Sequence, residues 1–197
     1  PRQSKPPCIT TQRRLLDSHR PGTEPLRVLS ASGQLGYGIP AESLARGMAR
    51  RPHFIGADMG SIDPGPYYLG SGQMAAPPAM VRRDLALVLD AALDAGVPLI
   101  IGSAGTAGAA PQLQATAALI REIAAERGRA LRLCTVASDL DAATVLQALD
   151  DQRLTPIGPM PEPTPDEVRA CTHIVGQCGT ETLARALATD PDVLLVG

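Results

Sequence analysis

The residues best suited to chemistry lie in residues 56–72, which read GADMGSIDPGPYYLGSG. This stretch follows an apolar run and carries two carboxylates, Asp58 and Asp63, and two adjacent phenols, Tyr67 and Tyr68. Two carboxylates in one glycine-rich loop can serve as general acid and general base, and a tyrosine can orient a substrate oxygen. We therefore predict Asp58, Asp63 and Tyr67 as catalytic residues. The alternative is that Asp58 caps a turn, Asp63 begins the Asp-Pro-Gly-Pro turn and the tyrosines pack the loop.

A second candidate is GSAGTAG, residues 102–108, which lies between a predicted strand and a predicted helix. Glycines let backbone N–H groups approach a ligand, and the helix N-terminus adds a positive dipole end. The segment therefore predicts a cradle for a phosphate or a carboxylate, although small residues there could equally serve a tightly packed turn. The predicted substrate- or anion-binding residues are Ser32, Gly33, Gln34, Gly60, Tyr68, Gly102, Ser103, Gly105, Thr106, Gln177 and Thr180.

The sequence does not identify a cofactor. It contains no P-loop pattern, and the one match to G-x-G-x-x-A, GSGQMA, follows a loop instead of a strand, so there is no nucleotide fingerprint. Asp58 and Asp63 could hold a divalent cation through oxygen ligands, but we predict no metal site.

The cysteines give little functional signal. On a predicted strand Cys171 and His173 share a face, and Cys178 follows in the next loop. Three ligands without a fourth, and no C-x-x-C, argue against zinc. We expect Cys134 and Cys171 to be buried as small apolar side chains. Cys178 at a helix N-terminus could be a nucleophilic thiol, but no histidine is placed by sequence to activate it.

The elements that must position these residues alternate between strand and helix. We predict strands at residues 26–31, 53–59, 97–103, 130–138, 171–177 and 192–197, and helices at 39–51, 78–96, 112–128, 139–152, 164–170 and 179–190. This rhythm predicts an α/β fold: an open, mainly parallel sheet with helices on both faces, Rossmann-like and three-layered. In such sheets ligands bind beyond the carboxyl ends of the strands, so the glycine-rich loops should converge on one site.

The composition limits the domain organisation and the classes of protein that this chain can belong to. The chain has 197 residues, of which 44% are apolar, and this supports a polar arm over residues 1–25 followed by a single domain over residues 26–197. The net charge of −2 and the low aromatic content of 2% argue against nucleic-acid binding. No apolar run approaches the roughly 20 residues of a membrane span. Without a secretory signal or a cysteine pairing pattern, the expected compartment is the cytoplasm.

Four segments together resemble the AtuA-type acyclic terpene utilisation proteins: SASGQLGYGIP, IGADMGSIDPGPYYLGSG, LIIGSAGTAG and HIVGQCGTETLARALATDPDVLLVG. The resemblance runs from about residue 27 to residue 197. Members of that family are longer and continue past the last glycine, so the resemblance implies the N-terminal part of a longer protein, incomplete at its C-terminus. It also implies a role in the catabolism of branched terpenoid acids, as acyl-CoA or as free acids. No catalytic residue is carried over from the family.

From the residues and the resemblance together we expect an enzyme, or its N-terminal part, that acts on a carboxylate or acyl-CoA by hydratase or lyase chemistry. Two alternatives stay open: a non-catalytic substrate-binding or scaffolding subunit, and a nucleotide- or phosphosugar-binding enzyme. The expected partner is a small anionic substrate. Because the last predicted strand ends the chain, we also expect a homo-oligomer or a partner subunit that completes the C-terminal edge.

Overall fold

The computed structural model describes residues 25–197; the predicted arm, apart from Pro25, lies outside the described residues, as do Cys8 and His19. In chain order the elements are β1 (Val28–Ser32), α2 (Ala41–Met48), β2 (Phe54–Asp58), α3 (Tyr67–Ser71), α4 (Pro78–Ala95), β3 (Leu99–Gly102), the 3₁₀ turn η1 (Ala104–Thr106), α5 (Ala110–Glu126), β4 (Leu133–Val136), α6 (Ala142–Asp150), α7 (Pro165–Ala170), α8 (Thr180–Leu187) and β5 (Val193–Val196). No helix among the described residues is both long enough and apolar enough to cross a bilayer.

The five strands form one open sheet in the order β1-β2-β3-β5-β4, and every neighbouring pair is parallel. The predicted α/β fold with a parallel sheet is therefore confirmed. The expectation that the last strand forms an edge of the sheet is wrong. β5 lies inside the sheet between β3 and β4, and all four of its residues are buried. The edge strands of the described sheet are β1 and β4.

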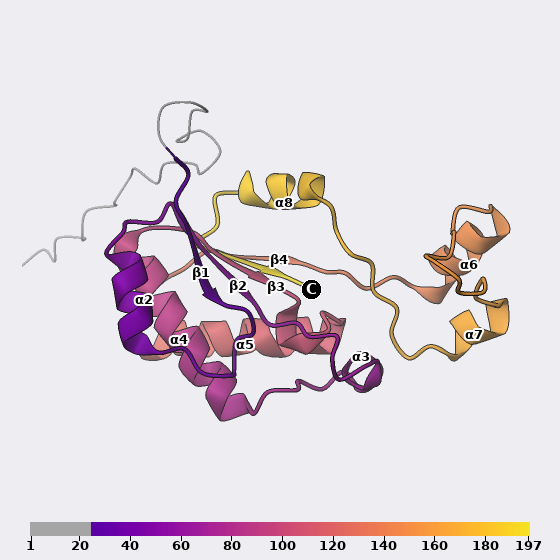
Figure 1. The fold of residues 1–197 in the computed structure, drawn as a ribbon, viewed down its shortest axis with the longest axis horizontal. Coiled ribbons are helices and arrows are strands. Elements are labelled where there is room, and N and C mark those ends of the chain that lie inside the picture. Colours follow the sequence, from indigo (N-terminus) through magenta and orange to yellow (C-terminus); the bar gives the residue numbers. More distant parts are fainter. Residues whose placement is uncertain (1–24) are drawn as a thin grey trace, which may run out of the picture.

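Helices cover both faces of the sheet, as Figure 1 shows: α2, α4 and α5 lie on one side and α8 on the other. The chain steps from β1 to β2 to β3 and then past the place of β5 to β4, with α2, α4 and α5 in the connections. It then steps back from β4 to β5 through α8. Since parallel crossovers are right-handed, reversing the direction across the sheet moves the connecting helix to the opposite face.

Two apolar clusters hold these layers together. The larger one packs Ile55, Leu99 and Leu195 of the sheet against α4 and α5, and the smaller one packs Leu194 and Val196 against α8. Alternate residues of β5 thus point to opposite clusters, as the two-residue period of a strand requires. Leucine, isoleucine, valine and alanine fill both clusters, because the chain holds a single phenylalanine and no tryptophan.

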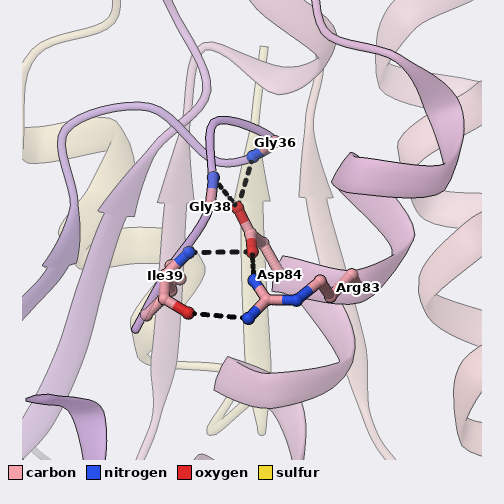
Figure 2. A network of polar contacts seen from close by, with 5 residues as sticks. All are labelled: Gly36, Gly38, Ile39, Arg83 and Asp84. Atoms are coloured by element: carbon pink, nitrogen blue, oxygen red, sulfur yellow. Dashed lines mark hydrogen bonds and ion pairs between the residues drawn. The ribbon is translucent and has the colours of Figure 1, made fainter. Parts of the chain in front are cut away.

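A buried carboxylate fixes the loop that follows β1 (Figure 2). Asp84 of α4 is fully buried, and its carboxylate accepts hydrogen bonds from the N–H groups of Gly36, Gly38 and Ile39 at 2.9–3.0 Å. Arg83 donates to the same carboxylate at 2.7 Å and to the carbonyl of Ile39 at 3.1 Å. Three backbone donors and one guanidinium therefore compensate the burial of one charge.

Predicted helix ends are found where the sequence places them. Gly96 ends α4 in the left-handed conformation with φ of 64°. At the start of α7, Thr164 and Glu167 form the capping box expected from their spacing: each side chain accepts a hydrogen bond from the backbone N–H of the other residue. The hydrogen bonds from the N–H and then the hydroxyl of Thr164 lower the pKa of Glu167.

We expect the Glu167→Gln substitution to destabilise α7 near neutral pH and to have no effect in strong acid. A carboxylate whose folded pKa is depressed stabilises above its unfolded pKa, about 4.3, and loses that contribution as the pH falls through the folded pKa. Thermal midpoints of wild type and variant, followed from neutral pH into acid, should therefore converge. Glu162→Gln is the matched control, because Glu162 makes no hydrogen bond within residues 25–197. A gap that persists at the lowest pH contradicts the prediction.

Two segments differ from the prediction. Residues 171–177 do not form a sheet strand; Val175 instead makes a single antiparallel bridge with Asp139, just beyond the carboxyl end of β4. Residues 56–72 are not wholly loop, since they contain the helix α3. Pro66 precedes that helix and Gly72 ends it in the left-handed conformation, so the same prolines and glycines that predicted a loop bound a short helical turn.

Candidate functional site

A cavity of about 750 Å³ opens at the carboxyl ends of four strands, β2, β3, β5 and β4. The two segments predicted to converge, residues 58–72 and 102–108, do line it together. The lining residues are Asp58, Gly60, Ser61, Ile62, Asp63, Gly65, Pro66, Leu69, Ser103, Thr106, Ala107, Ser138, Val175, Gly176, Gln177 and Gly197.

The strand order explains why a cavity forms there. The chain leaves β3 toward α5 on one face of the sheet, whereas after β4 it runs through α6 and α7 and then returns as α8 on the other face. β5 lies between these two strands and brings Gly197 to the same end. Loops that diverge to opposite faces leave a crevice between them, which is the usual ligand site of open α/β sheets.

Asp58 is the last residue of β2 and lies opposite Gly102 of β3. Its carboxylate is exposed to the cavity, and its Oδ1 accepts a hydrogen bond from the N–H of Gly60 at 2.7 Å. This local bond orients one oxygen and leaves the other without a hydrogen bond inside residues 25–197. The turn-forming role and an acid–base role are thus compatible in one side chain.

Ser103 follows β3 directly and has the left-handed conformation, φ 50° and ψ 50°. Neither its hydroxyl nor its N–H group makes a hydrogen bond within the described part of the chain. A Cβ atom added to Gly60 would lie 2.5 Å from Cβ of Ser103 and 3.1 Å from Oδ1 of Asp58. The absence of a side chain at Gly60 therefore lets both Ser103 and the carboxylate of Asp58 pack against this residue.

Strain is concentrated in the loop after β3. Thr106, a β-branched residue, has a φ of 101°, which is uncommon outside glycine. Its hydroxyl accepts a hydrogen bond from the N–H of Ala75 at 2.9 Å, which ties this loop to the chain before α4. Non-glycine residues in left-handed conformations cost about 1–3 kcal/mol each and are most common at binding and catalytic sites.

Gln112 supports the cavity from behind and was missed by the sequence analysis. Its side chain is fully buried in the first turn of α5; Oε1 accepts from the N–H of Ala109, and Nε2 donates to the carbonyls of Tyr68 and Gln73. The side chain thus ties both ends of α3 to α5. A signal was available, because a glutamine amid the apolar positions of a helix must find buried polar partners.

We expect Gln112→Leu to loosen the α3 wall of the cavity and to cost about 2–3 kcal/mol of unfolding free energy, because three backbone groups lose their buried partner. Urea unfolding measures the loss. Hydrogen exchange should rise at residues 67–73 above the change elsewhere. Gln114→Leu, on the exposed side of the same helix, is the control and should be close to neutral. Equal effects of both substitutions would contradict the supporting role of Gln112.

The charges in the cavity have one sign. Asp58 and Asp63 are its charged lining residues, and no lysine, arginine or histidine of the described chain lines it. Its polar lining consists otherwise of hydroxyls, the amide of Gln177 and backbone groups, and Ile62, Leu69 and Val175 form an apolar part. Such a lining suits a neutral carbonyl group with a hydrocarbon chain better than a free anion.

The structure brings together some of the predicted site residues and not others. The cavity lining contains Asp58, Asp63, Gly60, Ser103, Thr106 and Gln177. It does not contain Tyr67, Tyr68, Ser32, Gly33, Gln34, Gly102, Gly105 or Thr180. Tyr67 is 60% exposed, and its ring lies edge-on to the ring of Tyr68. Ser138 and Gly197, which follow the neighbouring strands β4 and β5, also line the cavity.

The cysteine prediction is corrected in part. Cys171 is exposed, because residues 171–177 leave the sheet, so it is neither a core residue nor on a strand face with His173. Cys134 and Cys178 are half-buried and pack against the smaller apolar cluster, the one between the sheet and α8. Within residues 25–197 no three histidine, cysteine, aspartate or glutamate side chains are grouped so that they could hold a metal ion.

Comparison with family models, with curated proteins and with solved structures found no match for this chain.

Proposed function

We propose that the chain carries the acyl-binding site of an enzyme that acts on acyl thioesters such as acyl-CoA, with proton transfer of the hydratase or lyase type. The observation that carries this proposal is that Asp58 and Ser103 both line the cavity and both pack against Gly60. In this proposal Asp58 moves a proton at the carbon next to the carbonyl. Ser103 donates a hydrogen bond to the carbonyl oxygen, where negative charge develops.

The charges of the cavity support a thioester over a free acid. Two carboxylates line the cavity with no lysine, arginine or histidine of residues 25–197 among the lining, so they repel a free carboxylate or phosphate, whereas a thioester carbonyl is neutral. The anionic part of a coenzyme A ester could remain outside the open cavity. Ile62, which is 94% exposed at the rim, together with Leu69 and Val175, offers an apolar surface to the acyl chain.

The test uses butyryl-CoA as the probe, with free coenzyme A and butyrate as comparison ligands. We expect butyryl-CoA to raise the thermal midpoint most, since a ligand at 100 times its Kd adds about 2.7 kcal/mol to the stability of the native state. We also expect the protein to exchange the C2 hydrogens of butyryl-CoA in D2O, followed by NMR. Asp58→Asn should slow this exchange by roughly 10²–10⁴-fold.

Asp90→Asn is the matched control, because Asp90 lies on the outer face of α4 in an exposed ion pair with Arg127. Its exchange rate should equal that of the wild type. No stabilisation by butyryl-CoA and no exchange would overturn the proposal. Stabilisation by butyrate alone would replace the thioester with the free acid, and binding without exchange would favour a non-catalytic binding subunit.

A further inference from the structure

One wall of the cavity belongs to a part of the chain that is joined to the body by few contacts. We call residues 141–173, with α6 and α7, the lobe, and residues 138–140 and 174–176 the neck. Figure 1 shows α6 and α7 packed on each other and set apart from the layered body. No residue of the lobe belongs to either apolar cluster of the described chain.

The neck is a short antiparallel pair. Leu140 donates its N–H to the carbonyl of Ile174 at 2.9 Å, Gly176 donates to the carbonyl of Ser138 at 2.8 Å, and Asp139 bridges to Val175. Ser138, Val175 and Gly176 line the cavity. Any rotation of the lobe about the neck therefore acts directly on one cavity wall.

Beyond the neck, one hydrogen bond ties the lobe to the rest of the described chain. Thr172 donates its hydroxyl to the carbonyl of Gly70 in α3 at 2.8 Å. The remaining side-chain hydrogen bonds and ion pairs of the lobe stay within the lobe. Gly70 is adjacent to Leu69, which lines the opposite wall of the cavity. We call this bond between the two walls the latch.

We propose that the lobe is hinged at the neck and that the latch sets the width of the cavity entrance. Rotating the lobe away breaks the latch and moves His173 from beside Gly72, but it separates no residues of the two apolar clusters. The rotated state should therefore lie close in free energy to the latched state. Hinged closure around a ligand with element-terminal residues as the pivot is a common device for admitting a substrate and then excluding water. The part of this inference that concerns access to the acyl site rests on the proposed function.

The experiment measures the position of the lobe without any ligand. Spin labels are attached to p-acetylphenylalanine at Ala115, exposed on α5, and at Ala143, exposed on α6. The distance distribution is then recorded for the wild type, for Thr172→Val, and for Gly70→Cys/Thr172→Cys in a Cys171→Ser background. A Cβ added at Gly70 would lie 3.5 Å from Oγ1 of Thr172, close enough for a disulfide between the two introduced cysteines.

We expect Thr172→Val to add or enlarge a second distance component. Oxidation of the double-cysteine variant should leave a single component, and dithiothreitol should restore the second. Identical single-component distributions for all three proteins would overturn the hinge. Thr144→Val, which removes a hydroxyl that bonds only within the lobe, is the control and should match the wild type.

The second measurement separates this inference from the proposed function. The association rate of butyryl-CoA should fall at least tenfold in the oxidised double-cysteine variant and recover on reduction. An unchanged rate overturns gating even if the lobe moves. If the wild type binds no butyryl-CoA, the proposed function fails, while the distance distributions still decide whether the lobe is hinged.

Discussion

Asp84→Ala is expected to lower the free energy of unfolding by about 3–5 kcal/mol, the range typical of removing one partner from a buried charged network. The substitution leaves the N–H groups of Gly36 and Ile39 buried without acceptors. It also releases the loop that donates from Leu35 to the carbonyl of Asp58 at 2.7 Å. Urea unfolding should show a lower midpoint with an unchanged slope, because the same surface is still exposed.

Two further variants locate the cause of this loss. Asp84→Asn keeps the side-chain volume but places an NH2 group, which can only donate, against backbone N–H groups. It should therefore also be strongly destabilising, although less than the alanine variant. Arg83→Ala removes a half-exposed partner and leaves the three backbone bonds intact, so we expect a loss of about 1 kcal/mol. A loss for Arg83→Ala as large as that for Asp84→Ala would mean that the ion pair, and not the loop, dominates.

Gly108→Ala is expected to cost about 3 kcal/mol or more, from a left-handed conformation together with a backbone collision. Gly108 has a φ of 74°, and a Cβ there would collide with the backbone of Gly197. The hydroxyl of Ser138 donates to the carbonyl of Gly197 at 2.7 Å, so the collision would displace three segments that line the cavity. Thermal unfolding and the binding of butyryl-CoA should both be impaired.

Gly128→Ala separates the two causes. Gly128 also has a left-handed conformation, with φ of 62°, but a Cβ there would meet nothing within 4 Å. It should therefore show only the conformational cost, about 1–2 kcal/mol. If Gly108→Ala costs no more than Gly128→Ala, the close approach of Gly108 to Gly197 is not a constraint on this fold.

The features that sequence reasoning predicted correctly are those with local causes. The helices at residues 78–96 and 164–170 follow from apolar spacing, from Gly96 and from the capping box of Thr164 and Glu167. The parallel sheet follows from the alternation of apolar strands with helices, and the meeting of residues 58–72 with residues 102–108 follows from the polarity of parallel strands.

The features that it missed depend on contacts between distant segments. Nothing in residues 171–177 distinguishes a sheet strand from a neck segment, because the choice depends on their pairing with residues 138–140, which are distant in the sequence. The loop partners of Asp84 are 45–48 positions away, and the two carbonyl partners of Gln112 lie 39–44 positions away. The hydrogen bond between Ser138 and Gly197 depends on the strand order, which residue patterns do not specify.

The position of β5 also bears on the order of events during synthesis. Of the five strands it leaves the ribosome last, yet it pairs with β3 and β4, which emerge well before it. A nascent chain that stops short of Val193 contains the first four strands, but the strand that pairs with both β3 and β4 is still missing. Completing the sheet therefore needs a late, long-range insertion, which is the kind of step that slows folding.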